Sequence, residues 1–300
     1  MEKKIKSVKA TRRQQYLDRF DSAELKEMVF VTEEQHFDEQ GRLLSISKYS
    51  RPDELEEKIV KSYDGNTVIT EYYIDENELS EKSVAEINEN GRIVRETMYY
   101  ADSTESVSEF EYDGERPLKK TTMDIDEYER ELSGEHTWTY DGAGNLLREE
   151  ENEYGELSFY REMKYDDKNR MVAQTTFHAA DGKSSHDEME WEGEEVSHVI
   201  KTDIYGNKTE SFYKYNAQGD AAHIQFKSKA FNSETVMEYD ADNNAIHEKE
   251  TDDKDEVLYE VFRQFHPETK KLVRVETYIN RQGQGTDVHY MLEYEYEFFE

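Results

Sequence analysis

Hydrophobic and polar positions alternate with a period of two along most of this chain, in short stretches separated by turn signals. Around residue 140, Trp138 and Tyr140 fall on one face of an expected strand and Thr139 on the other. Asp141 suits the first position of a turn, where its carboxylate can accept backbone N–H groups. Gly144 stands where a three-residue hairpin loop with a G1 bulge needs a positive φ. The pattern predicts a β-hairpin, not a binding loop.

The same strand–turn–strand sequence pattern, which we call the hairpin phrase, recurs along the chain at steps of 24 to 28 residues. We call the ring or apolar residue that ends the first strand of each copy its anchor. Where the loop glycine is replaced it becomes Asn, which tolerates the left-handed region best. A second turn signal follows most anchors by 13 to 16 residues. A sustained period of this length indicates a repeat architecture with two strands and two turns per unit. The anchors are Phe37, Tyr63, Ile87, Tyr112, Tyr140, Tyr165, Trp191, Tyr215, Tyr239 and Phe265.

The expected fold is all-β: a repetitive antiparallel array of about ten hairpin units that forms a long, twisted or spiralling sheet with a thin core. The residue two before each anchor is usually large and the one between is polar, which predicts one aromatic face and one wet face. Residues 36–300 form the repeat domain, and residues 1–35 form an N-terminal extension or cap. Within that cap, residues 1–12 read as a frayed end. Residues 11–28 loosely fit a short helix, and Phe20 to Leu25 also resemble a broken copy of the hairpin phrase. Residues 290–298 alternate as a final strand with a charged outer face.

The amino-acid composition says more about the class of binding partner than about the fold. The chain has 300 residues, a net charge of −33, 22 tyrosines and no cysteine. The charge argues against nucleic acid and favours either a cationic partner or simple solubility. No stretch resembles a signal peptide or a membrane span, so we expect no membrane partner. We expect a cytoplasmic location, or an extracellular one if a leader was removed.

Candidate chemistry is sparse, and we expect no catalytic, cofactor or metal site. His178 and His186 flank a turn and could face each other, but zinc would need further ligands such as Asp187 or Glu188. Acidic clusters resemble calcium loops without the spacing of an EF-hand, and Asp is also the expected turn residue. No nucleophile elbow, phosphate loop or dinucleotide fingerprint is present. The acidic clusters are Asp124-Asp126-Glu127, Asp240-Asp242 and Asp252-Asp253-Asp255.

The hairpin phrase resembles the YD repeat, also called the RHS repeat, with the pattern Tyr-Asp-x-x-Gly-Arg/Asn-Leu. Tyr140 to Leu146 is a full match, and Phe37 to Leu43 is one with Phe for Tyr. The resemblance covers residues 36 to about 275 and implies a spiralling β-sheet, which in large secreted members forms a shell around a toxin. This chain is much shorter and lacks the family's self-cleavage motif and toxin segment, so only the fold is implied.

Three functions follow as hypotheses. The first is a non-catalytic acidic scaffold that binds a cationic protein, in its specific form an immunity protein of a polymorphic toxin. The second is an extracellular or surface module that binds glycan or a larger shell protein, with Tyr73 and Tyr160 as candidate aromatics on the wet face. The third, disfavoured, is a hydrolase with paired carboxylates. The oligomeric state is left open.

Overall fold

The computed structural model describes residues 3–17, 25–280 and 288–300, and every regular element in them is a β-strand. In chain order the strands are β1 (Ile5–Leu17), β2 (Leu25–Phe37), β3 (Leu43–Arg51), β4 (Glu54–Asp64), β5 (Thr67–Tyr73), β6 (Leu79–Ile87), β7 (Ile93–Tyr100), β8 (Glu105–Asp113), β9 (Arg116–Ile125), β10 (Arg130–Tyr140), β11 (Leu146–Glu153), β12 (Glu156–Tyr165), β13 (Met171–His178), β14 (Lys183–Glu192), β15 (Glu195–Thr202), β16 (Lys208–Tyr215), β17 (Ala221–Ser228), β18 (Asn232–Tyr239), β19 (Ala245–Asp252), β20 (Val257–Phe265), β21 (Leu272–Ile279) and β22 (Val288–Phe298).

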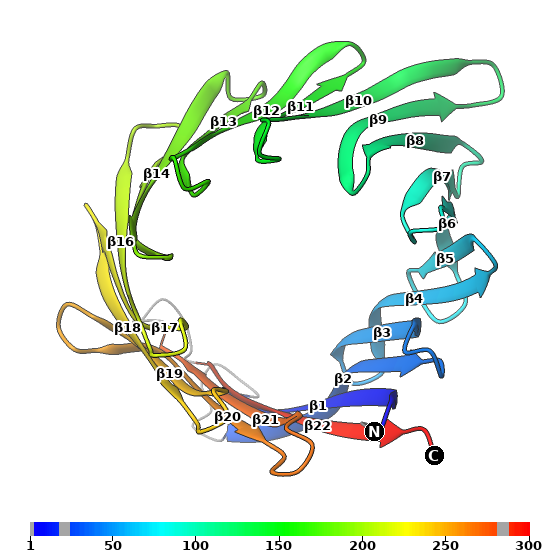
Figure 1. The fold of residues 1–300 in the computed structure, drawn as a ribbon. Helices are drawn as coiled ribbons and strands as arrows, with labels where there is room; N and C mark the ends of the chain where they lie inside the picture. Colours follow the sequence, from blue (N-terminus) through cyan, green and yellow to red (C-terminus); the bar gives the residue numbers. More distant parts are fainter. Residues whose placement is uncertain (1–2, 18–24, 281–287) are drawn as a thin grey trace.

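The strands form one closed antiparallel ring (Figure 1). Each strand pairs with the next in sequence, and β22 returns to pair with β1 from Gln14 opposite Tyr290 to Ile5 opposite Phe298. The prediction of an antiparallel hairpin array is confirmed, and the prediction of an open, spiralling sheet is wrong. Strands spaced about 4.8 Å apart and tilted as in other barrels give 22 strands a diameter on the order of 40 Å.

The N-terminal segment is part of the ring and not a frayed or helical cap. β1 and β2 pair with each other from Ser7 opposite His36 to Leu17 opposite Leu25, so the expected helix is wrong in the described part of residues 11–28. These strands are rich in charged and amide side chains, which hide the alternation. Their partners explain the composition: on one face Lys9 lies opposite Glu295, and on the other Ala10 lies opposite Tyr294.

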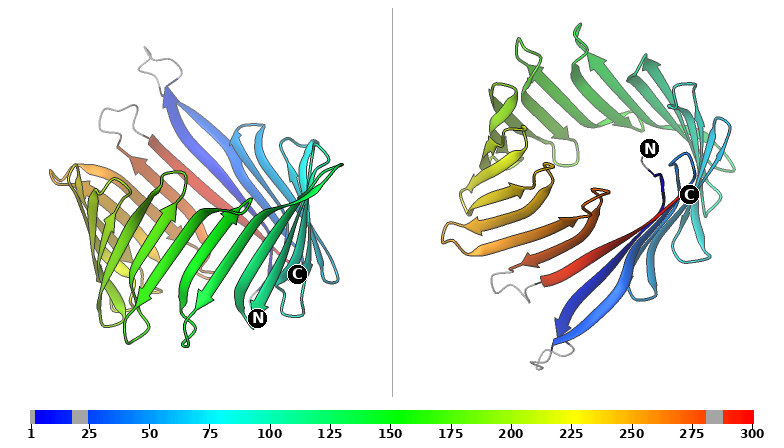
Figure 2. Two further views of the ribbon diagram at one scale, coloured as in Figure 1. Left: turned by 90° about the horizontal axis from the view of Figure 1, so that it is seen from above. Right: turned by 60° about the horizontal axis from the view of Figure 1, so that its bottom comes forward.

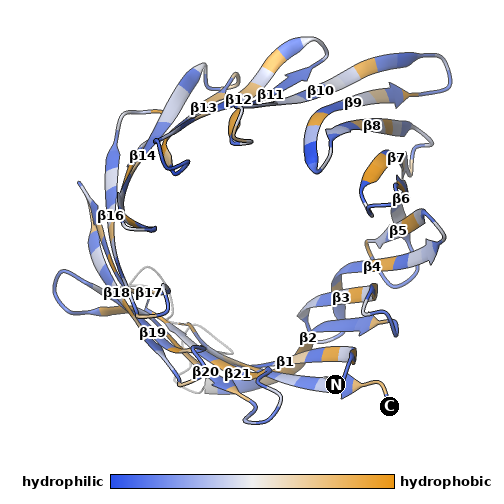
Figure 3. Cartoon of the chain, in the orientation of Figure 1, coloured by the Kyte–Doolittle hydropathy of each residue, from blue (hydrophilic) through white to orange (hydrophobic). Residues whose placement is uncertain are grey.

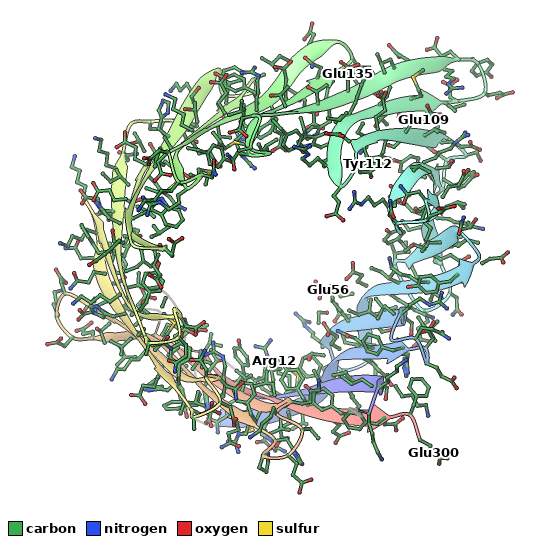
Figure 4. The ribbon with its side chains drawn as sticks, viewed as in Figure 1. Arg12, Glu56, Glu109, Tyr112, Glu135 and Glu300 are labelled. Atoms are coloured by element: carbon green, nitrogen blue, oxygen red, sulfur yellow. The ribbon has the colours of Figure 1, made fainter. Side chains whose placement is uncertain are left out.

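The two faces of the sheet differ as the alternation predicts. Residues directly opposite each other in neighbouring strands share a face, and following these pairs around the ring keeps the anchors on one face. Figure 4 shows Arg12 and Tyr112 pointing toward the centre of the ring and Glu109 and Glu135 pointing away from it. The anchors therefore line the inner face. Blue and orange segments alternate along individual strands in Figure 3.

The thin core lies mainly on the inner face, because a concave face crowds its side chains. Ala85, Met163, Val261 and Thr277 are buried there, while Val107 is buried on the outer face. No second layer of secondary structure covers the sheet within residues 3–17, 25–280 and 288–300. Neighbouring side chains on the same face therefore supply most of the packing.

Each Tyr or Trp anchor joins its repeat to the preceding one. The Tyr140 hydroxyl donates a 2.9 Å hydrogen bond to the carbonyl of Pro117, and the Arg116 guanidinium lies over the Tyr140 ring at 5.4 Å. The same hydroxyl-to-carbonyl bond recurs at the other five Tyr anchors, and Trp191 makes the equivalent bond to the Met171 carbonyl through its indole nitrogen. The repeated contacts run from Tyr63 to Leu43, Tyr112 to Ile93, Tyr165 to Leu146, Tyr215 to Val196 and Tyr239 to Ala221.

The turns that follow the anchors have the predicted geometry. Asp141 and Asn145 close the loop by a 3.0 Å backbone hydrogen bond, and the register shifts by one residue at Thr139 and Tyr140. Gly144 has a φ of 93°, and the substitute Asn169 has a φ of 62°. Hence the G1 bulge and the left-handed asparagine are both confirmed.

Because the strands run up and down in order, alternate turns lie at opposite ends of the ring (Figure 2). The anchor rim contains the turns after the anchors, from residues 38–42 to residues 266–271, together with the ends of β1 and β22 that lie near the termini. The far rim contains the other turns, from residues 52–53 to residues 253–256.

Candidate functional site

The far rim carries a continuous arc of negative charge over three successive turns. These turns lie between β5 and β6, between β7 and β8 and between β9 and β10. Arg130 is the one cationic residue of the three segments 75–78, 102–105 and 126–131. We call the carboxylates of these segments the acidic arc, namely Asp75, Glu76, Glu78, Asp102, Glu105, Asp126, Glu127, Glu129 and Glu131.

A hollow of about 460 Å³ opens within the arc, between the β7–β8 and β9–β10 turns. Tyr100 and Ile125 supply its apolar wall, and neither lysine nor arginine lines it. Burial, with Glu81 and Asp124 nearby, raises the pKa of the Tyr100 phenol. The carboxylates of the lining are Asp102, Glu105, Asp124, Asp126, Glu129 and Glu131.

Turn hydrogen bonds keep part of the arc ionised. The Asp126 carboxylate accepts the backbone N–H groups of Glu129 and Tyr128, and these bonds lower its pKa. The hydroxyl and backbone N–H of Thr104 do the same for Asp102. A carboxylate that accepts such bonds holds its negative charge well below neutral pH. The arc is therefore a fixed anionic surface.

Exposed aromatic rings stand beside these charges. The Tyr128 side chain lies at the tip of the β9–β10 turn and is 86% exposed, and Tyr154 in the next far-rim turn is 62% exposed. The Tyr154 hydroxyl donates a 3.2 Å hydrogen bond to Asp124, so the ring is anchored at the border of the hollow. Tyrosines that present both a ring and a hydroxyl at low entropic cost are typical of protein-binding surfaces.

The anchor rim, in contrast, uses its cations internally. Arg42 pairs with Asp38 of its own turn at 2.7 Å and lies over the Tyr63 ring at 4.2 Å. Arg92 reaches the next turn and donates to the Gly114 carbonyl at 2.7 Å. Side chains thus link neighbouring anchor-rim turns, whereas the arc holds charge without a balancing set of cations.

The two histidines considered for zinc do not face each other. His178 lies opposite Phe159 on the inner face, while His186 lies opposite Thr175 on the outer face and contacts its hydroxyl at 2.9 Å. The expectation that they could meet across the hairpin is wrong, because they occupy positions of opposite parity on paired strands. Across the described ranges, no three His, Cys, Asp or Glu side chains are grouped to hold a metal ion.

The calcium-like clusters hold turns together. Asp240 accepts the backbone N–H groups of Asp242 and Asn244, both at 2.9 Å. Asp252 does the same for Lys254 and Glu256. Asp is therefore present at these positions as a turn acceptor, as the sequence also suggested.

The two tyrosines considered for glycan stacking lie on the outer face, as the alternation predicts. Tyr160 is stacked on Phe177 at 5.1 Å and carries the Arg148 guanidinium over its ring at 4.4 Å. Tyr73 has Lys58 over its ring and bonds Glu71. These rings already contact neighbours of this chain.

A regular set of histidines lies on the outer face between β14 and β22 and was not predicted from the sequence. His198 lies between Glu190 at 3.4 Å and Glu210 at 3.3 Å and is stacked on Phe212 at 4.1 Å. His247 repeats the arrangement with Glu238, Glu260 and Phe262, and His289 repeats part of it with Glu276 and Tyr278. The sequence feature that could have indicated them is the spacing of His198, His223 and His247, which matches the spacing of the anchors. The contacts join adjacent strands.

The comparisons with known proteins give fold-level similarity only. No protein-family model matches the chain, and no curated protein matches it. The YD repeat therefore remains a resemblance carried by the hairpin phrase. Within the described ranges, no helix has the length and apolar character needed to cross a membrane.

Among solved structures, a chain of the Photorhabdus luminescens Tc holotoxin pore is similar over 91% of this chain and 18% of its own length, with 12% identity and a TM-score of 0.42. A chain of the TcdB2-TccC3-Cdc42 structure is similar over 92% of this chain and 22% of its own, with 11% identity and a TM-score of 0.30. A porin-like protein from Bacteroides uniformis is similar over 99% of both chains, with 8% identity and a TM-score of 0.33. These similarities are weak.

Proposed function

We propose that this protein is a non-catalytic binding scaffold whose acidic arc docks a cationic protein. The observation that carries the proposal is the concentration of carboxylates around an exposed tyrosine and a hollow without a cationic lining. Like charges gathered in this way repel one another and cost stability. Such local conflicts are expected at functional sites.

The closed ring supports the proposal indirectly. A negative surface on an open sheet protects its edge strands from pairing with other chains. Here β22 pairs with β1, so both ends of the sheet are already paired and need no such protection. The arc would instead steer a basic partner by long-range attraction, with Tyr128 and Tyr154 supplying apolar contact area. In its narrower form, the proposal is that the partner is a toxin and this chain its immunity protein.

The test compares full-length variants in which three charges are removed at two places. The arc variant carries Glu127→Gln, Glu129→Gln and Glu131→Gln. The control carries Glu109→Gln, Glu111→Gln and Glu188→Gln, which lie on the outer face in the middle of strands. Both variants gain the same net charge, so a general electrostatic effect changes both equally.

We expect the wild type and the control to retain the same basic protein from a lysate, and the arc variant to bind it about tenfold more weakly. Retention by the wild type should fall as salt rises toward 0.5 M, on the order of the ionic strength that screens surface charges. Equal loss in the two variants, or no enriched basic protein, would refute docking at the arc.

A further inference from the structure

A second hollow lies on the far rim beside the acidic arc and has a different chemistry. It encloses about 640 Å³ between the β11–β12 and β13–β14 turns. Phe159, Leu157, Ala179 and Ala180 supply its apolar lining, and the carboxylates of Glu151, Glu153 and Glu156 provide charge. It thus combines a carbon-lined recess with carboxylates at one side.

The strand register builds this hollow. On the inner face Phe159 lies between Glu151 of β11 and His178 of β13, each directly opposite it in its neighbouring strand. The β11–β12 pairing shifts by one residue at Glu151 and Asn152, leaving Ser158 in a bulge. The Ser158 carbonyl accepts the Ala179 N–H at 2.9 Å, which fixes the following turn beside the recess.

The carboxylates of this hollow lack the internal partners that a neighbouring one has. Glu149 lies two residues before Glu151 on the same face and contacts both His136 at 3.1 Å and Arg161 at 3.4 Å. Within the part of the chain that the structure describes, the carboxylates of Glu151 and Glu153 make neither an ion pair nor a hydrogen bond. Half-buried Glu151 beside an apolar wall is thus a charge without a counter-ion.

We infer that this hollow binds a primary alkylammonium group, with the carbon stem against Phe159 and Leu157 and the ammonium between Glu151 and Glu153. The form of the recess favours ammonium over guanidinium. An alkylammonium fits an aliphatic recess as a compact charge on a carbon stem.

Two further side chains border the hollow, on its Phe159 side. Arg161 lies over Phe159 at 5.5 Å, and its guanidinium is directed to Glu149. His178 contacts the Phe159 ring at 5.2 Å and is directly opposite Lys183.

The inference does not depend on a protein docking at the arc. The alkylammonium could belong to a free polyamine or to a lysine side chain, and the probes separate these sources. Calorimetric titration of the full chain with 1,4-diaminobutane tests the first, and titration with N-acetyl-lysine methylamide tests the second. 1-Butanol supplies the same stem without charge. Saturable binding of either cation and none of butanol is the expected result, and the tighter-binding cation identifies the source.

The Glu151→Gln, Glu153→Gln variant should bind the diamine at least tenfold more weakly. The Glu109→Gln, Glu111→Gln variant changes the same number of charges on the outer face and should bind it as the wild type does. Circular dichroism confirms that both are folded. Unchanged binding in the Glu151, Glu153 variant, equal loss in the control, or binding of butanol would each overturn the inference.

Discussion

At the residue scale, the hairpin phrase combines local turn chemistry with a long-range bond, and only the first could be predicted. Asp141, Gly144 and the asparagines that replace glycine satisfy rules that act within five residues, so the sequence indicates them directly. The bond from Tyr140 to the Pro117 carbonyl joins residues 23 apart. It depends on the position of the neighbouring hairpin, which sequence spacing does not specify.

Gly144 and Gly142 form a matched pair within one turn. Gly144 has a φ of 93°, and an added Cβ would lie 3.1 Å from the Arg116 side chain, whereas Gly142 meets nothing within 4 Å. Gly144→Ala should destabilise the fold by about 1 kcal/mol or more, because alanine is strained at positive φ. Gly142→Ala should be neutral or slightly stabilising. Urea unfolding measures both, and equal effects would contradict the G1 bulge as the cause.

Asp141 makes the stability of its turn depend on pH. Hydrogen bonds from the Asn145 side chain and from backbone N–H groups lower the pKa of its carboxyl. A depressed folded pKa stabilises the fold above the unfolded value, about 3.9, and this contribution is lost as pH falls through the folded pKa.

Asp141→Asn is the informative change, because asparagine occupies this position naturally in two other turns. Asn88 and Asn216 accept the same two backbone N–H groups at 2.9 to 3.0 Å. The variant should match the wild type near pH 7 and become the more stable of the two below about pH 4. Unfolding curves at several pH values test this. A difference that stays constant with pH would show that the carboxylate charge has no such role.

At the element scale, β1 was the strand hardest to predict, whereas its partner in closing the ring, β22, was predicted over residues 290–298. The repeats show period-two alternation with a turn at each end, which is enough to identify a strand. β1 carries the charged residues Lys6, Lys9 and Arg13. Lys6 and Lys9 lie beside Glu297 and Glu295, almost three hundred residues later in the chain. Hence its strand character follows from its partner and not from its own pattern.

Lys9 and Glu295 test this partnership, because they lie directly opposite each other on the outer face of the seam between β1 and β22. Lys9→Glu places like charges opposite each other and should cost about 0.5 to 1 kcal/mol. Adding Glu295→Lys should restore most of the loss. Urea unfolding of the four proteins in a double-mutant cycle measures the coupling, which should shrink at high salt. A coupling free energy near zero at low salt would show that the charges of Lys9 and Glu295 do not help to close the ring.

At the scale of the whole molecule, the repeat predicts the local sheet but not its closure. Twist and tilt accumulate over many hairpins, and a small change per strand separates a spiral from a ring. The candidate sites could not be predicted from the sequence for a similar reason. The far-rim hollows combine turns from successive hairpins, such as residues 102–105 with 126–131, and become visible only when neighbouring turns are known to share a rim.

Closure can be tested covalently, because the chain has no cysteine of its own. Thr11 of β1 and Glu293 of β22 are directly opposite on the outer face, at a spacing that suits a disulfide. Thr11→Cys with Glu293→Cys should therefore form an intramolecular disulfide under mild oxidation. Mass spectrometry of a proteolytic digest would detect the linked peptides.

Thr11→Cys with Thr121→Cys places the second thiol on the outer face of β9, remote from the seam, and should stay reduced under the same conditions. A disulfide confined to the first pair, and independent of protein concentration, requires β1 and β22 of one molecule to be neighbours. If the first pair formed only concentration-dependent dimers, the two strands would pair between copies. The chain would then be an open array like the one that its repeats alone predict.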